Sequence, residues 1–386
     1  MSRDGMRVAI NLLTDHPEHP SGAHWGWTRM VPEIASRLVD GEELHLVVSP
    51  RSKPLHEYPG SNVHYLMAPW SNEHQRLRTL SEQLYLPPRL RAAGIDVFNT
   101  LIAPLVRPAP GVVAHFKTFQ AFNDPGSLSP AVRAYRRIGY PHTVKMADAI
   151  VVNSEDLRAE VLRYLDVDPG KLRLVPEAVD HDTFRPGDPE EARVRVKERG
   201  VTRPFVLFVS SLWRYKNAHG LMRAFAQARS SLEGYQLVVV GPLREEEYVG
   251  ELRRLAEELG IADDVVWVGG VPLEETVDFY RCAKVFAYPS FNESFGLPIL
   301  EAMACGCPVV TSDRTATQET AGSAAILVDP DDVEQIATAL VRACGPDHEA
   351  LRGRGLERAA QFTWAATAEK TLAVYREVHQ ARVQAR

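Results

Sequence analysis

The sequence predicts an α/β protein built from two doubly wound parallel sheets, and three observations lead to this prediction. The chain has 386 residues, which is too many for one ordinary hydrophobic core and suits two domains. Short Val-rich runs recur along it and are uniformly apolar, as in strands that helices bury on both faces. Helix-like segments separate these runs at the spacing of a parallel sheet.

The apolar runs define the expected strands. In the second half they are 204–211, 235–241, 264–270, 284–290, 307–312 and 324–330. In the first half they are 7–13, 44–49, 63–67, 95–100, 111–116, 149–154 and 172–178. Longer polar loops that carry aromatic residues interrupt the first half, and loops beyond strand ends are where such domains hold their ligands.

Composition limits the kind of protein. The net charge of −6 argues against a protein that binds nucleic acid over a large basic surface. No apolar run approaches the roughly 20 residues that span a bilayer, and the N-terminal apolar stretch is too short for a signal peptide, so we expect a cytoplasmic protein. The four cysteines form no CxxC pair, and we expect free, buried thiols.

Two carboxylates near the end of one expected strand are the strongest functional signal. Glu293 and Glu301 flank a turn that contains Gly296 and opens a short helix, with Pro298 in the first helical position. The free amides at this helix start suit a phosphate. A carboxylate accepts hydrogen bonds from vicinal hydroxyls, so one Glu could hold a sugar and the other a ribose. Solvent-facing glutamates are the plainer alternative, but Glu301 is flanked by apolar residues.

Two cations follow another expected strand. Arg214 and Lys216 come after the strand 204–211 and lie at the same carboxyl edge of the sheet as Glu293. An Arg can clamp phosphate oxygens in pairs while a Lys acts as a point charge. We therefore expect a diphosphate site, with solvated loop cations as the alternative.

These motifs resemble the retaining family 4 glycosyltransferases of the GT-B fold. The resemblance is carried by VSSLWRYKN, by YPSFNESFGLPILEAMACGCPVVTS with its E-x7-E pattern, and by AILVDP. It is strong over about 204–364 and weaker but collinear before that. It implies two Rossmann-like domains, 1–185 for the acceptor and 186–363 for the nucleotide sugar, with a cleft between them. A helix in 364–386 would return to the first domain.

The resemblance also implies roles for individual residues. Glu293 would contact donor-sugar hydroxyls, Glu301 the ribose, and Arg214 with Lys216 the diphosphate; His115 matches a family His near the anomeric carbon. The expected catalytic set is Glu293, His115, Lys216 and Arg214, and the expected donor-binding set is Glu301, Ser294, Phe295, Gly296, Leu297, Gly22 and Val271. Packing alone is the alternative for His115, and a plain turn is the alternative for Gly22.

Three positions depart from the family pattern. Ser211 stands where members often carry an Arg, Ala23 where they carry a second glycine, and Phe116 where they carry an Asp after the His. The absence of the usual Arg is a second reason to expect Arg214 in the diphosphate site, besides its position at the carboxyl edge of the sheet.

Two groups in the first half have both a functional and a structural interpretation. The aromatic group would stack on a sugar or form the cores of loops; it comprises Trp25, Trp27, Trp70, Phe116, Phe119 and Phe122. The basic group would touch an anionic membrane or simply face solvent; it comprises Arg133, Arg136, Arg137 and Lys145.

The expected reaction is transfer of a sugar from a nucleoside diphosphate to an acceptor hydroxyl with retention, without metal or cofactor. The acidic strings 180–182 and 329–331 lie away from the phosphate site, so we do not assign them a metal. A sugar phosphorylase, a nucleotide-sugar epimerase or a silent sugar-binding subunit remain alternatives. A dinucleotide-dependent oxidoreductase is disfavoured because no strand leads into GxGxxG.

Overall fold

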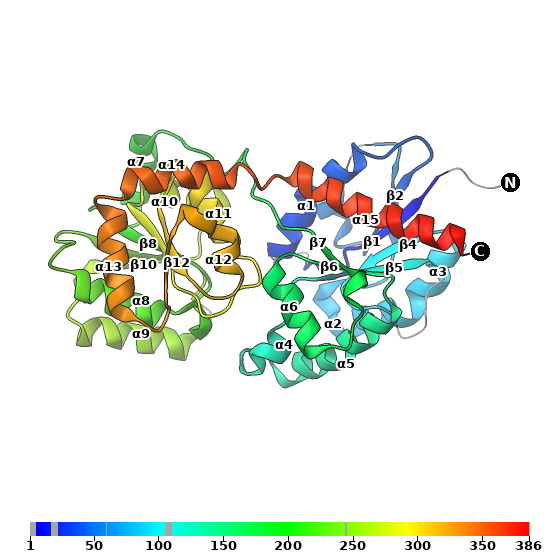
Figure 1. Cartoon of the computed structure of the whole chain (residues 1–386), viewed down its shortest axis with the longest axis horizontal. Helices are drawn as coiled ribbons and strands as arrows, with labels where there is room; N and C mark the ends of the chain where they lie inside the picture. The colour runs from blue at the N-terminus through cyan, green and yellow to red at the C-terminus, as the bar shows by residue number, and fades with distance from the viewer. Residues whose placement is uncertain (1–4, 17–21, 59, 105–109, 244, 386) are drawn as a thin grey trace. The chain divides into compact units, whose positions relative to one another are not determined.

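The computed structural model describes residues 5–16, 22–58, 60–104, 110–243 and 245–385, apart from the side chains of 22–25 and 127. The chain divides into two compact units. The first comprises Met1–Glu177 and Trp364–Arg386, and the second comprises Ala178–Thr363 (Figure 1). The chain therefore passes between the units twice, and the expected boundary at 185/186 falls inside the second unit.

The first unit contains a parallel sheet in the order β3-β2-β1-β4-β5-β6-β7. The strands are β1 (Arg7–Asn11), β2 (Glu43–Val48), β3 (Val63–Met67), β4 (Val97–Thr100), β5 (Gly111–Phe116), β6 (Ala149–Val152) and β7 (Leu172–Leu174). Each overlaps an expected strand. The strand order reverses between β1 and β4, and ligands of open α/β sheets bind beyond the carboxyl ends of such a pair.

Helices cover both faces of this sheet, as the uniformly apolar strands predict. They are α1 (Gly22–Ala35), α2 (Gln75–Leu80), α3 (Leu86–Ala92), α4 (Gln120–Asn123), α5 (Pro130–Met146), α6 (Glu155–Tyr164) and α15 (Trp364–Gln384). Along β1, Val8 and Ile10 pack in the cluster that includes α1 and α15, whereas Ala9 packs with Leu86 and Leu90 of α3.

The final helix, α15, packs on the first unit beside α1 (Figure 1). Arg376 makes an ion pair with Glu42, 2.7 Å between Nη2 and Oε2, and the Glu42 side chain is only 8% exposed. Asn99 of β4 donates a hydrogen bond to the hydroxyl of Tyr375, and both side chains are buried. A polar contact inside the core thus fixes the register of α15 against the sheet.

The second unit contains a parallel sheet in the order β10-β9-β8-β11-β12-β13. The strands are β8 (Phe205–Val209), β9 (Gln236–Val240), β10 (Val265–Gly269), β11 (Val285–Tyr288), β12 (Val309–Ser312) and β13 (Ile326–Val328). All six lie within expected strands. The strand order reverses between β8 and β11.

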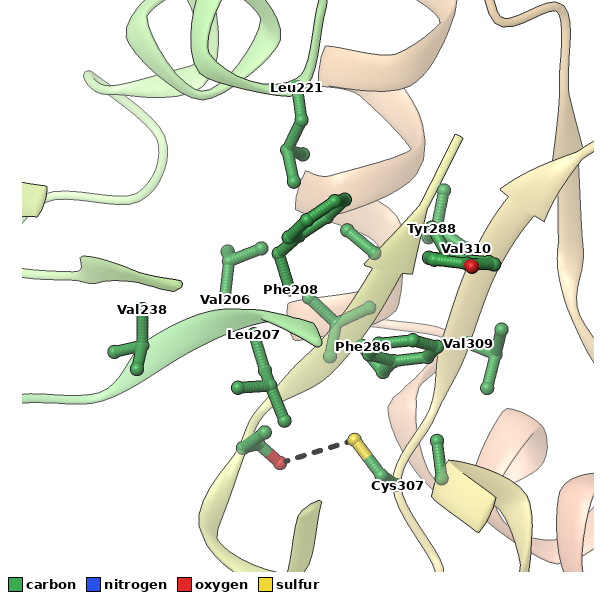
Figure 2. Packing of buried hydrophobic residues seen from close by; sticks show 14 of the residues in the cluster. Val206, Leu207, Phe208, Leu221, Val238, Phe286, Tyr288, Cys307, Val309 and Val310 are labelled. Carbon is green, nitrogen blue, oxygen red and sulfur yellow. Dashed lines mark hydrogen bonds between the residues drawn. The ribbon is translucent and has the colours of Figure 1, made fainter. Parts of the chain in front are cut away.

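The helices of the second unit also cover both faces of its sheet. They are α7 (Pro189–Glu198), α8 (Ala218–Ala228), α9 (Glu246–Glu258), α10 (Leu273–Cys282), α11 (Leu297–Ala304), α12 (Ala316–Ala321), α13 (Val333–Cys344) and α14 (His348–Ala359). Figure 2 shows part of the core, where Leu221 of α8 points toward Phe208 of β8. These arrangements confirm the predicted fold class of two Rossmann-like domains with a helical C-terminus.

The four cysteines are free, as expected. Cys305 and Cys307 are buried, whereas Cys282 and Cys344 are only partly buried. The Cys307 thiol lies 3.9 Å from the carbonyl oxygen of Ala283 (Figure 2). Among the described residues, none of the helices combines the length and the apolar character needed to cross a membrane.

We expect Tyr375→Phe to destabilise the first unit by about 1–3 kcal/mol, because it leaves the buried Asn99 amide without its acceptor. Urea denaturation followed by circular dichroism measures this. Val383→Ala, at a position of α15 that is 54% exposed, is the matched control and should change the unfolding free energy by less than about 0.5 kcal/mol. Equal stability of Tyr375→Phe and wild type would show that the contact does not anchor α15.

Candidate active site

Three polar side chains meet where β8 and β11 end, at the reversal of strand order in the second unit. The Lys216 ammonium donates hydrogen bonds to Glu293 Oε1 at 2.5 Å and to the Tyr288 hydroxyl at 2.7 Å. The Tyr288 hydroxyl donates to the same Glu293 oxygen at 2.7 Å. The structure thus brings together Lys216 and Glu293, which the sequence predicted separately, and adds Tyr288.

This cluster is largely shielded from water. The side chains of Lys216 and Glu293 are 12% and 11% exposed. Burial acts to lower the pKa of Lys216, but Glu293, Tyr288 and Tyr215 together outweigh it and the pKa is raised, so the ammonium is retained at neutral pH. Burial and then Glu293 raise the pKa of Tyr288, which therefore remains a hydrogen-bond donor. The cluster can offer a fixed cation to a phosphate and a carboxylate to sugar hydroxyls.

Asn217 holds the loops that carry this cluster. Its backbone is left-handed (φ 60°), and its Oδ1 caps α8 by accepting from Gly220 N at 3.1 Å. Its Nδ2 donates to the carbonyl oxygens of Pro289 at 3.0 Å and Pro330 at 2.7 Å. A side chain at Gly220 would place its Cβ 2.4 Å from Asn217 Oδ1. One buried amide therefore links the segments that follow β8, β11 and β13.

The loop after Glu293 leads into the start of α11. Thr315 accepts a hydrogen bond from the Glu293 amide at 3.1 Å, and Thr320 donates to the carbonyl of Phe295 at 2.5 Å. Gly296 precedes α11 with a φ of 91°, a conformation that only glycine adopts without strain. The predicted residues Ser294, Phe295, Gly296 and Leu297 thus lead directly into the helix N-terminus, which favours an anion.

Glu301 lies in the second turn of α11. Burial raises the pKa of its carboxyl to about 7, although the hydrogen bond that Tyr280 donates at 3.1 Å opposes this. The group is therefore partly ionised near neutral pH, and it can respond to a ligand that binds its carboxylate. The sequence did not identify Tyr280, because a tyrosine on the buried side of an amphipathic helix has no signal beyond packing.

Two other predicted residues of this unit lie differently. The structure does not bring Arg214 to the cluster: its guanidinium pairs with Glu251 of α9 at 2.6 Å and lies 4.7 Å from the Tyr248 ring centroid. Val271 follows β10 and packs against the edge of the core. The diphosphate contact of Arg214 and the donor contact of Val271 stay predictions.

In the first unit, His115 lines a small cavity of about 20 Å³. The imidazole is 8% exposed, and burial, with a smaller effect of Lys117, lowers its pKa to about 3. Its Nε2, Asn153 Oδ1 and Trp364 Nε1 are buried without a hydrogen-bond partner among the described residues. The three residues line this one cavity, whose volume suits a single water. His115 is therefore a neutral hydrogen-bonding group.

The remaining first-unit predictions have mixed outcomes. Gly22 begins α1, but the loop before it (17–21) and the side chain of Trp25 lie outside the described residues. Phe116 and Phe119 are 1% exposed and pack on Tyr140, so they belong to the hydrophobic core and cannot stack on a ligand. Arg137 donates to the Ala121 carbonyl.

The acidic strings have local partners. Arg314 pairs with Asp329 at 2.5 Å and with Asp331 at 2.7 Å. The Asp180 carboxylate accepts a hydrogen bond from the Thr183 hydroxyl at 2.6 Å. Within the described ranges, no group of three or more His, Cys, Asp and Glu residues has the arrangement of a metal site.

Comparison with known families gives two matches that together cover most of the chain. The family described as "Glycosyltransferase Family 4" matches residues 26–183, and the family described as "Glycosyl transferases group 1" matches residues 190–344.

Individual relatives are similar over part of their length. A D-inositol 3-phosphate glycosyltransferase of Acidothermus cellulolyticus is 37% identical over 253 residues, which are 63% of this chain and 56% of the relative. The O-antigen chain mannosyltransferase B of Escherichia coli is 32% identical over 234 residues, 60% of this chain and 61% of the relative. The chain thus spans a little more than half the length of these relatives.

Solved structures are similar over nearly the whole chain. Sucrose-phosphate synthase from Thermosynechococcus elongatus has a TM-score of 0.74 at 19% identity, covering 97% of this chain and 100% of that one. Anabaena Alr3699/HepE in complex with UDP-glucose has a TM-score of 0.70 at 17% identity, covering 98% and 100%. At these identities the likeness establishes the fold.

We expect Asn217→Gly to destabilise the second unit by about 3 kcal/mol, roughly 1 kcal/mol for each hydrogen bond lost. The glycine keeps the left-handed backbone, so the loss reports the side chain alone. Asn217→Ala should lose a further 1 kcal/mol or so through backbone strain. Thermal and urea unfolding of both variants measure this, and a variant as stable as wild type would contradict the linking role of Asn217.

Proposed function

The chain belongs to the family 4 glycosyltransferases of the GT-B fold, and from this premise we propose that it transfers a sugar, with retention, from a nucleoside-diphosphate sugar to an acceptor hydroxyl. The observation that carries the proposal is the Lys216–Tyr288–Glu293 cluster beside the start of α11. A fixed ammonium, helix amides and a carboxylate are the groups that a sugar diphosphate needs.

In the proposed reaction, the bond between the anomeric carbon and the diphosphate oxygen breaks and the diphosphate keeps the electron pair. Lys216 and the first amides of α11 stabilise the charge that develops on this leaving group. The acceptor oxygen attacks on the same face, and its proton passes to the departing phosphate oxygen. Glu293 accepts hydrogen bonds from the sugar hydroxyls, and no residue becomes covalently attached to the sugar.

His115 has a narrower role in this proposal. Its pKa of about 3 leaves the imidazole uncharged at neutral pH, so it contributes a hydrogen bond near the anomeric carbon, as the family resemblance implies, and no positive charge. The proposal therefore depends on Lys216, and not on His115, for the positive charge of the site.

The similar proteins support the class of substrate. Anabaena HepE has been solved with UDP-glucose, and the relatives in sequence are named as a glycosyltransferase of inositol phosphate and as a mannosyltransferase. Their sugars and acceptors differ, so we propose the nucleoside-diphosphate sugar as the donor class and leave the base and the sugar to experiment.

We expect Glu293→Ala and Lys216→Ala each to lower sugar transfer by about 10²-fold or more, the effect typical of losing one preorganised polar group. Initial rates with UDP-, GDP- and ADP-sugars measure this, and circular dichroism checks the fold. Arg254→Ala, an exposed change on α9, is the control. Wild-type turnover in either cluster variant would refute the assignment.

We also expect nucleotide affinity to rise with pH through the pKa of Glu301. Ribose hydroxyls donate to the ionised carboxylate, and a carboxyl whose pKa is about 7 is mostly protonated at pH 6 and mostly ionised at pH 8. Affinity for UDP or GDP should therefore increase about tenfold over this range.

Glu301→Gln provides the matched control for this pH dependence, since it cannot ionise. Titrations of both proteins at pH 6 and pH 8 separate the Glu301 contribution from ionisation of the nucleotide itself. Identical pH profiles in the two proteins would contradict the ribose contact.

A further inference from the structure

The first unit contains an arginine, Arg78, that is buried and has no counter-ion among the described residues. Arg78 of α2 is 6% exposed, and its Nε is inaccessible to solvent and has no hydrogen-bond partner. No hydrogen bond or ion pair joins its guanidinium to any described residue. A buried cation without a partner destabilises a protein strongly, so its presence calls for an anion that binds there.

Arg78 belongs to a polar cluster at the reversal of strand order in this sheet. Asn11 and Thr100 are the last residues of β1 and β4, and the Asn11 amide donates to Glu82 Oε1 at 2.9 Å and lies 3.4 Å from the Thr100 hydroxyl. Glu82 is 6% exposed and lies in a π-helical turn, Ser81–Tyr85, that continues α2. Such turns occur often at functional sites.

Arg78 and Glu82 occupy one neighbourhood without pairing. They are four residues apart along continuous helix, and both act on the Tyr135 hydroxyl: burial and then the Glu82 carboxylate raise its pKa to about 12, while Arg78 opposes them. No ion pair within 4.0 Å joins the two side chains. Ser81, 2% exposed, adds a hydroxyl without a partner. The cluster therefore offers a cation, a carboxylate and a hydroxyl that still have hydrogen-bonding capacity for a ligand.

This combination matches a polyol or sugar that carries a phosphate. The planar fork of an arginine binds two phosphate oxygens at once. A carboxylate accepts hydrogen bonds from the hydroxyls of a polyol, and a serine hydroxyl can both accept from and donate to them. We propose that Arg78, Ser81 and Glu82 form the acceptor subsite and that the acceptor is a phosphorylated sugar or polyol, bound through its phosphate by Arg78. This inference rests on the proposed transferase function and adds the class of its acceptor.

The melting temperature of the variant Arg78→Met distinguishes this proposal from a purely structural role, in which Arg78 is a distant counter-charge to Glu82. If Arg78 is kept for a ligand, Arg78→Met removes an unpaired buried charge and raises the melting temperature of the ligand-free protein by a few degrees. If Arg78 stabilises the fold through Glu82, the same change lowers the melting temperature. A lower melting temperature together with unchanged phosphate binding overturns the proposal.

Direct binding tests the ligand class. Calorimetric titrations use D-myo-inositol 3-phosphate, glucose 6-phosphate and inorganic phosphate, with myo-inositol and glucose as uncharged counterparts. We expect at least one organic phosphate to bind the wild type tenfold or more tightly than its uncharged counterpart, and Arg78→Met to lose that preference. Arg78→Lys keeps the charge but not the fork, and should retain part of it. Arg76→Met, an exposed change two residues away on α2, is the matched control.

Three results would overturn the acceptor assignment: no organic phosphate binds the wild type, inorganic phosphate binds as tightly as every organic one, or Arg78→Met binds like the wild type. Donor binding and donor cleavage are measured separately in the same variants, by titration with UDP and GDP and by the slow hydrolysis of the nucleotide sugar. Loss of phosphate binding with intact nucleotide binding supports the proposal. Failure of the wild type to bind any nucleotide would refute the transferase function but leave the phosphate site standing.

Discussion

The ion pair between Lys216 and Glu293 is the contact on which the second unit's candidate site depends. It joins the loops that follow β8 and β11, and these strands are neighbours at the point where the sheet reverses its order. Helices leave such a pair toward opposite faces, so the loops diverge and leave room for a ligand. The amide of Asn217 fixes both loops, and the pair therefore stands preformed beside the α11 amides.

The same constraint organises the first unit. Its sheet reverses between β1 and β4, and there the chain places Asn11, Thr100 and Glu82, with Arg78 one turn before Glu82. In both units the strands are mostly apolar, and the polar residues of the two candidate sites lie at or near the carboxyl ends of their strands. In the two proposals made above, one unit recognises the nucleotide sugar and the other recognises the acceptor.

The sequence predicted the parts of the molecule that depend on local pattern. Every expected strand formed, because uniformly apolar runs between helical segments admit few other structures, and Glu293 and Lys216 were found because each follows such a run. The sequence did not identify Tyr288, because a tyrosine at the end of a strand has the pattern of a core residue. It did not identify Asn217, because the carbonyl groups that its amide binds lie 72 and 113 residues away in the sequence. Arg214 was expected beside Lys216, but the 3-10 turn between them directs its guanidinium to Glu251.

A crystal structure of the protein soaked with UDP, GDP or ADP tests the central claim most directly. The account predicts electron density for a diphosphate against Lys216 Nζ and the first amides of α11, with the ribose hydroxyls on the Glu301 carboxylate. A nucleotide bound elsewhere, with Lys216, Tyr288 and Glu293 untouched, would contradict it.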